Sequence, residues 1–267
     1  MEAAGGGSTE ASAIARPKAF AITATILGLV FGLAFFGFPG LILGWFEGGD
    51  RLIHRVHDLS NGVLTGLLFA LPLLALAVRK RVAPLHQVAV ASLAGIAAAA
   101  ISADAIWLVF VAPGLVAVAV LLGIGGPAFR RAFLAPERNP SPGLAVIPLA
   151  AAVPLTMFAW SMAKLQRAGV AGDSHVDEHH WAAMASMAIT LWLVPLLASL
   201  RMPGWLVPAR CAGLGAVVFG VASLVFPDTA GSVGKTWGIE LILGGAVYLG
   251  LVELEARRSH VRPPGSA

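Results

Sequence analysis

The fold is decided by residues 57–81, which read HDLSNGVLTGLLFALPLLALAVRKR. The middle of this stretch, residues 62–78, is almost uninterrupted apolar sequence. About 20 apolar residues in a helix cross the hydrocarbon core of a bilayer. The stretch therefore predicts a membrane-spanning helix that starts beside a histidine and an aspartate and ends at a basic cluster, Arg79 to Arg81.

The composition of the whole chain agrees with this. Of its 267 residues, 58% are hydrophobic and 12% are charged, and the mean hydropathy is +0.83. A typical soluble domain is about 45–50% apolar and about 25% charged, so a water-soluble enzyme is excluded. Disorder, collagen and coiled coil are excluded by the scarcity of charge, the lack of a glycine period and the lack of heptads. The lone Cys211 excludes an intrachain disulfide and a cysteine-based zinc site.

Eight apolar runs predict an all-α integral membrane protein with eight transmembrane helices. The basic residues explain the net charge of +4 without nucleic acid as a partner, because they cluster between the apolar runs. Thirteen of the 18 Lys and Arg residues fall on the side of the two termini, which predicts that both termini are cytoplasmic. We expect the protein to lie in the cell (inner) membrane, with the lipid bilayer as its partner. The expected spans are residues 19–38, 60–78, 86–103, 106–124, 143–163, 181–200, 206–226 and 236–254.

An internal duplication is indicated by matched spacings. His57 lies 15 residues before Pro72, and His180 lies 15 residues before Pro195, so the second pair follows the first at an offset of 123 residues. Asp228 follows Asp104 at nearly the same offset, 124 residues. We expect two four-helix repeats with the same orientation, related by a pseudo-two-fold axis along the membrane normal. The expected organisation is a flexible cytoplasmic tail (1–18), the first repeat (19–135), a Pro-rich linker (136–142), the second repeat (143–256) and a basic cytoplasmic tail (257–267).

Histidines and carboxylates gather on the predicted outer surface. If the duplication holds, His57 and His180 are symmetry mates at the outer ends of two helices and can present opposed imidazoles to one ion or to a haem iron. We therefore predict a site for a transition metal (copper, iron or zinc) or haem b, with these two residues as the primary ligands. The further candidates, as ligands or as groups that orient an imidazole, are His54, Asp58, His175, Asp177, Glu178 and His179.

Two methionines extend this set. Met184 and Met187 follow His180 at i+4 and i+7, and thioethers beside an imidazole suit a soft ion such as Cu(I). The expected activity is redox chemistry with a redox partner, as in a metal- or haem-dependent membrane oxidoreductase, or metal handling.

The same residues allow other interpretations. Residues 175–179 fit the H-x-x-E-H pattern of inverted zinc proteases, but only formally, because here the pattern lies in a turn just outside a membrane. The acidic residues can also simply cap helix N-termini.

Two alternative functions remain at this stage. Glu240 lies one turn inside the last span, and with Asp104 and Asp228 it could form the proton or substrate path of a secondary transporter. The chain could also be an accessory or scaffold subunit of a membrane complex, whose loops dock a partner.

Overall fold

The computed structural model describes residues 14–46, 48 and 53–261, with side chains up to residue 258. The predicted tails at 1–18 and 257–267 therefore lie partly outside the described residues. Within the described part every regular element is a helix. These helices are α1 (Pro17–Leu29), η2 (Val30–Ala34), α2 (Gly37–Leu43), α3 (Arg55–Asn61), η4 (Gly62–Ala70), α4 (Leu71–Arg79), α5 (Val82–Ser102), α6 (Trp107–Leu134), α7 (Pro142–Ala168), α8 (Ser174–Asp177), α9 (His180–Ala198), α10 (Leu206–Val225) and α11 (Gly234–Val261), of which η2 and η4 are π-helical.

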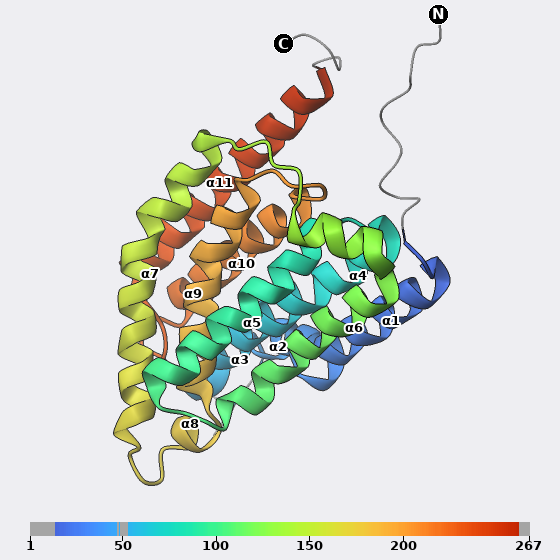
Figure 1. Ribbon diagram of the computed structural model, residues 1–267. Helices are drawn as coiled ribbons and strands as arrows, with labels where there is room; N and C mark the ends of the chain where they lie inside the picture. The colour runs from blue at the N-terminus through green and yellow to red at the C-terminus, as the bar shows by residue number, and fades with distance from the viewer. Residues whose placement is uncertain (1–13, 47, 49–52, 262–267) are drawn as a thin grey trace, which may run out of the picture.

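The eight predicted spans are confirmed among the described residues, where eight helical segments are long and apolar enough to cross a membrane. The close pair formed by α5 and α6 is separated at Ala103, whose left-handed backbone (φ 54°) ends α5. Gly126, with φ 81°, interrupts α6, so its membrane-crossing part ends near the predicted position 124. The last segment of α6 then runs in a different direction (Figure 1).

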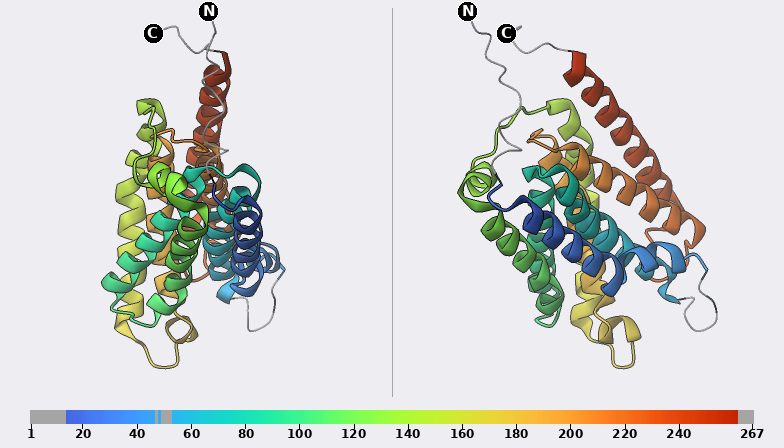
Figure 2. Two further views of the ribbon diagram at one scale, coloured as in Figure 1. Left: turned by 45° about the vertical axis from the view of Figure 1, so that its right-hand side comes forward. Right: turned by 90° about the vertical axis from the view of Figure 1, so that its right-hand side faces the viewer.

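The loops lie at two opposite ends of the bundle. At one end, Asn139 N–H donates to Leu200 O (3.0 Å) and Ala83 N–H donates to Pro203 O (3.1 Å), which joins three basic loops. The start of α1 lies at this end, through Ala15 N–H and Gly125 O (3.1 Å). The end of α11 lies there too, and the α7–α8 connection lies at the opposite end (Figures 1 and 2). The cytoplasmic orientation of this end and the duplication of the two halves stay predictions.

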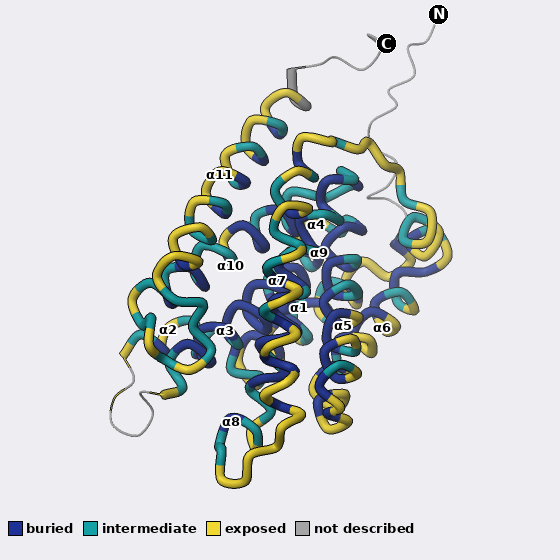
Figure 3. The backbone as a smooth tube through the Cα atoms, turned by 90° about the vertical axis from the view of Figure 1, so that its left-hand side faces the viewer, coloured by how far each residue is buried: buried dark blue, intermediate teal, exposed yellow. Residues whose placement is uncertain are grey.

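Helix α9 occupies the centre of the bundle. Of its most apolar stretch 72% is buried, against 22% for α7 and for α11. Figure 3 shows α7 and α11 with much of their surface exposed. The exposed side chains on the outer helices include Val153 and Leu243, which suits contact with lipid. α8 directly precedes α9, and both α3 and α8 pack against this most buried helix.

The first span differs from the single helix predicted at 19–38. The helix breaks at Phe36, which has a left-handed backbone (φ 59°), and continues as α2 beyond the predicted end of the span. α2 packs directly on α3 and η4, because glycines allow close backbone approach. A Cβ at Gly62 would lie 2.5 Å from Leu41 N. This contact holds α3 and η4, and the side chains they carry, close to the first span.

Two backbone carbonyls at interruptions of the helices lack a helical donor, and side chains replace it. Phe35 O lies at the break before α2 and accepts bonds from Asn61 Nδ2 (3.3 Å) and Thr65 Oγ1 (3.2 Å). At the second interruption, Pro72 has no N–H for Leu68 O, which accepts from Gln87 Nε2 (3.1 Å). Such replacement is needed because an unpaired carbonyl in hydrocarbon costs several kcal/mol.

The buried Gln87 amide also reaches Leu67 O (3.4 Å). Gln87→Met keeps a similar volume but removes this donor, and we expect it to destabilise the protein by about 1–3 kcal/mol. Thermal unfolding of the purified protein in detergent measures the loss. Ser92→Ala is the control on the same helix, because Ser92 donates only to Val88 O (2.9 Å) of its own helix. Equal midpoints for the two variants would contradict the assigned role of Gln87.

Candidate metal centre

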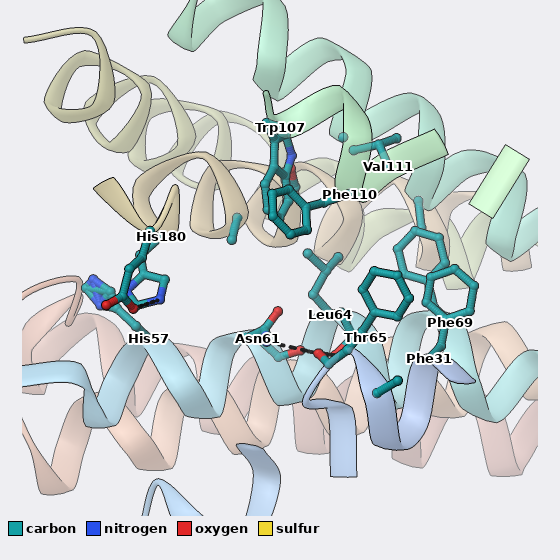
Figure 4. Close-up of a pocket in the computed structure, with 17 residues that line it drawn as sticks. Phe31, His57, Asn61, Leu64, Thr65, Phe69, Trp107, Phe110, Val111 and His180 are labelled. Carbon is teal, nitrogen blue, oxygen red and sulfur yellow. Dashed lines mark hydrogen bonds and ion pairs between the residues drawn. The ribbon is translucent and has the colours of Figure 1, made fainter. Parts of the chain in front are cut away.

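Four histidines meet at the end of the bundle opposite the basic loops. His54 immediately precedes α3, His57 lies in α3, His175 lies in α8, and His180 is the first residue of α9. Figure 4 shows the side chains of His57 and His180 close together and approaching each other from α3 and α9. The chain thus brings together histidines that are more than 100 residues apart in the sequence.

The four rings form one compact group. The distances between ring centroids are 4.4 Å for His57–His175, 4.7 Å for His54–His175, 5.1 Å for His54–His180, 5.4 Å for His57–His180, 6.0 Å for His175–His180 and 6.4 Å for His54–His57. Metal–nitrogen bonds of about 2.0–2.1 Å in a tetrahedral site place imidazole centroids on the order of 5 Å apart. The centroid spacings are close to those of a four-histidine metal site, whereas the donor atoms that lie within 4.8 Å of one another among the described residues belong to His54, Glu178 and His180.

Three ring nitrogens in this group are buried without a hydrogen-bond partner among the described residues. They are both nitrogens of His57, which is 2% exposed, and Nε2 of His175, which is 6% exposed. Each buried polar atom left without a partner costs about 1–3 kcal/mol. A metal ion is a partner that would use such lone pairs.

Asp173 orients the ring of His175. Its Oδ1 accepts from His175 Nδ1 (2.8 Å) and from His175 N–H (3.0 Å), so the same carboxylate caps α8. Burial acts to raise the pKa of Asp173, but the hydrogen bonds from His175 and Trp181 outweigh it and lower the pKa. An ionised carboxylate only accepts, so Nδ1 of His175 carries the proton and Nε2 presents its lone pair to the cluster. This is the arrangement of a metal-binding histidine with a carboxylate behind it.

At His180 a carboxylate, and at His54 a serine hydroxyl, lies against Nε2. Ser174 Oγ lies 3.4 Å from His54 Nε2, and Glu178 Oε2 lies 3.2 Å from His180 Nε2, while the two Nδ1 atoms face each other at 3.3 Å. Two nitrogens on one tetrahedral ion would be about 3.4 Å apart, given the bond lengths above. The described donor atoms of His54, Glu178 and His180 all lie within 4.8 Å of one another, so this group could hold a metal ion.

The loop between α10 and α11 closes over the cluster. A Cβ at Gly231 would lie 2.5 Å from Met184 Sδ and 2.9 Å from His57 Cε1, which places this thioether beside His57. Met187 is fully buried deeper along α9. Of the two predicted methionine ligands, the structure therefore brings Met184 to the site.

His179 lies apart from the four rings, although it stands beside His180 in the sequence. Its backbone is left-handed (φ 59°), and its Nδ1–H donates to Asp104 Oδ2 (2.6 Å). Asp104 also accepts from Trp107 N–H (3.2 Å) and so caps α6. The H-x-x-E-H reading needs His175 and His179 on one helical turn, but α8 ends at Asp177.

The remaining predicted residues are dispersed. Asp58 is buried in the first turn of α3, and Asp177 is exposed at the end of α8. Asp228 is exposed in the α10–α11 loop. Glu240 is exposed and lines a separate cavity of 80 Å³ that does not include the histidines. The structure therefore does not join Glu240 to the outer cluster.

Sequence reasoning missed three residues that shape the site. The sequence predicted no role for Asp173, although an aspartate directly before a helix is an N-cap signal. Trp181 packs against His57 (centroids 4.8 Å) and His175 (5.0 Å). Gly231 approaches the cluster from a distant loop, and nothing in its local sequence indicates this.

A cavity of 340 Å³ begins at this cluster and extends into the bundle (Figure 4). His57, His180 and Glu178 line its outer end. The site thus has both buried nitrogen ligands and adjoining space for a second molecule.

No family model matches this chain, and neither a curated protein nor a solved structure similar to it was found. The function has to be argued from the site alone.

Gly231→Ala tests how closely the loop packs on the cluster. The added methyl group collides with Met184 and His57, so we expect a loss of about 1–3 kcal/mol in stability beyond the backbone strain. Gly234→Ala is the matched control, because Gly234 also has a positive φ (76°) but has nothing within 4 Å of the added carbon. Thermal unfolding compares them, and a loss in Gly234→Ala as large as in Gly231→Ala would refute the contact.

Proposed function

We propose that the protein is an integral membrane protein that binds one transition-metal ion through His54, His57, His175 and His180, at its non-cytoplasmic face. The observation that carries the proposal is the set of buried ring nitrogens of His57 and His175 that have no partner among the described residues. Imidazole suits zinc, copper and iron. A bound ion would take one nitrogen from each ring, so it would satisfy His175 Nε2 and one of the two nitrogens of His57.

The surrounding oxygens support this assignment. Asp173, Ser174 and Glu178 lie against the ring nitrogens that face away from the centre, as oxygen partners of metal-bound histidines do. Glu178 has a side chain that is 59% exposed, so it can either orient His180 or turn to become a further ligand. Zinc binds four ligands drawn from histidine nitrogens and carboxylates, as this site offers. Coordination by the thioether of Met184 would instead favour Cu(I).

The geometry favours a bare ion over haem b. His57 and His180 have centroids only 5.4 Å apart, and the ring of His175 lies 4.4 Å from that of His57. A haem between the first two rings would need the space that His175 and its neighbours fill. The proposal is therefore a metal centre for metal handling or for metal-dependent chemistry at the membrane surface.

The first test is metal content. We expect the purified protein to hold about one metal ion per chain, measured by elemental analysis, and His57→Ala, His175→Ala and His180→Ala each to lose most of it. Removing even an outer partner of a ligand costs about 10–100-fold in affinity, and removing a ligand costs at least as much.

His179→Asn is the matched control, because His179 neighbours His180 in sequence but pairs with Asp104. Asn tolerates the left-handed backbone at this position. We expect this variant to keep its metal. If no metal binds to the wild type, even after titration with zinc, copper and iron, the proposal is wrong.

A second test addresses Asp173. Asp173→Asn removes the charged acceptor of His175 Nδ1–H but keeps an oxygen that caps α8, so we expect metal affinity to fall about 10–100-fold. Competition with a chelator measures the affinity. Asp177→Asn is the control, since Asp177 is exposed at the end of α8. Equal affinities in the two variants would remove Asp173 from the site.

A further inference from the structure

The cavity that begins at the histidines follows one face of α3 and η4. His57, Asn61, Leu64, Thr65 and Phe69 all line it. His57 and Phe69 are 12 positions apart, which is on the order of 15 Å along the helix axis, because the π-helical part rises less than 1.5 Å per residue. The cavity thus leads from the histidines into the bundle, along a helix that begins with His57 in its first turn.

The walls become apolar with distance from the histidines. At the deep end the cavity is lined by Phe31, Phe69 and Val111, and the rings of Phe31 and Phe69 stack with centroids 5.0 Å apart. Figure 4 shows these aromatic rings gathered at the end farthest from His57 and His180. A ligand in this space would have a polar group at one end and hydrocarbon at the other.

Beyond the histidines, the donors of the polar side chains along the wall all have acceptors. Trp107 Nε1–H donates to Ser186 Oγ (2.7 Å), which donates to Ala182 O (2.9 Å), and Thr65 donates to Asn61 O (2.8 Å). Asn61 Nδ2 donates to Phe35 O, but its Oδ1 has no donor among the described residues. One turn below the histidines, the wall therefore offers an amide oxygen that can accept from a hydroxyl or an amide N–H.

Two residues that line the cavity are also exposed at the surface of the bundle. They are Phe110, which is 43% exposed, and Ala34. They belong to the start of α6 and the end of η2, so an entrance from the lipid would lie between these two elements. A molecule dissolved in the bilayer could enter here without passing through water.

We propose that this cavity binds the hydrocarbon tail of a single-chain amphiphile, whose polar headgroup reaches the metal and whose hydroxyl or amide N–H lies at Asn61. Only the headgroup contact rests on the proposed metal function. The volume of 340 Å³ is near the lower limit of ligand pockets, about 300–1,000 Å³, which suits one chain and not a two-chain phospholipid.

A photoreactive amphiphile tests the tail site. Dodecanohydroxamate, with a chelating headgroup and a diazirine near the chain end, is irradiated with the full-length protein in lipid nanodiscs, and labelled peptides are mapped by mass spectrometry. We expect labels on the segment from Leu64 to Phe69 and around Val111, removed by unlabelled dodecanohydroxamate but not by acetohydroxamate. Labels confined to lipid-facing residues such as Val153 would overturn the proposal.

Variants that fill the cavity sharpen the test. Ala91→Phe occupies the deep end, and we expect at least a tenfold loss of labelling there, roughly what is lost when two methylene groups are no longer buried. Ala183→Leu is a milder change nearer the histidines, for use if Ala91→Phe does not fold. Ala119→Phe on the exposed face of α6 is the control and keeps the labelling. Unchanged labelling in both cavity variants would overturn the proposal.

Asn61 has its own test. In the wild type, 3-hydroxydodecanohydroxamate should compete with the probe about threefold to tenfold better than dodecanohydroxamate, the gain of one hydrogen bond. Asn61→Leu should remove this preference, whereas Thr65→Val should keep it. A preference that survives in Asn61→Leu would remove Asn61 from the ligand contact.

Metal content separates the two proposals. If the wild type contains metal but labelling never reaches the cavity, the tail site is wrong and the metal centre stands. If the wild type binds no metal while the probe still labels the deep wall, the metal centre is wrong and the tail site stands.

Discussion

Hydrocarbon offers no water to a backbone carbonyl, and the arrangement of this bundle follows from that constraint. Where the break at Phe36 and the proline at position 72 remove helical donors, side chains from neighbouring segments replace them: Asn61 and Thr65 at Phe35 O, and Gln87 at Leu68 O. These bonds tie the first span to α3 and η4, and α5 to η4. Asn61 and Thr65 also line the cavity, so the groups that repair the backbone shape the inner space of the protein.

The hydrogen-bond partners of the four clustered histidines differ from those of the other buried polar side chains. Most of the buried hydroxyl groups in the bundle donate to nearby carbonyls of their own helices. At His54, His175 and His180, an oxygen faces one ring nitrogen. The second nitrogens of His54 and His180 lie 3.3 Å apart, and Nε2 of His175 and both nitrogens of His57 have no partner among the described residues. A metal ion bound here would take one nitrogen from each ring and so offset part of the cost of burying these rings together.

Much of the fold could be predicted from the sequence, because each crossing needs a long apolar run and such runs are read directly. The meeting of His57 and His180 was also expected, from the matched spacing to Pro72 and Pro195. The sequence did not distinguish His179 from His180. The left-handed backbone at His179 turns its side chain toward Asp104, and the neighbouring sequence does not indicate this conformation. The break at Phe36 escaped prediction for a similar reason, since it depends on glycine contacts between α2 and η4.

The sequence by itself determined that the chain forms eight helices long and apolar enough to cross a membrane, where each of them lies along the chain, and that histidines gather beside the starts of two of them. These properties follow from composition and local pattern, because a helix in lipid needs a long run of apolar side chains. Only the tertiary structure decided which four imidazoles meet, that Asp173 bonds to one of them, and that a cavity leads inward from the group. The meeting of the imidazoles and the cavity depend on contacts between segments far apart in the sequence, whose relative positions are set by packing and not by any local pattern.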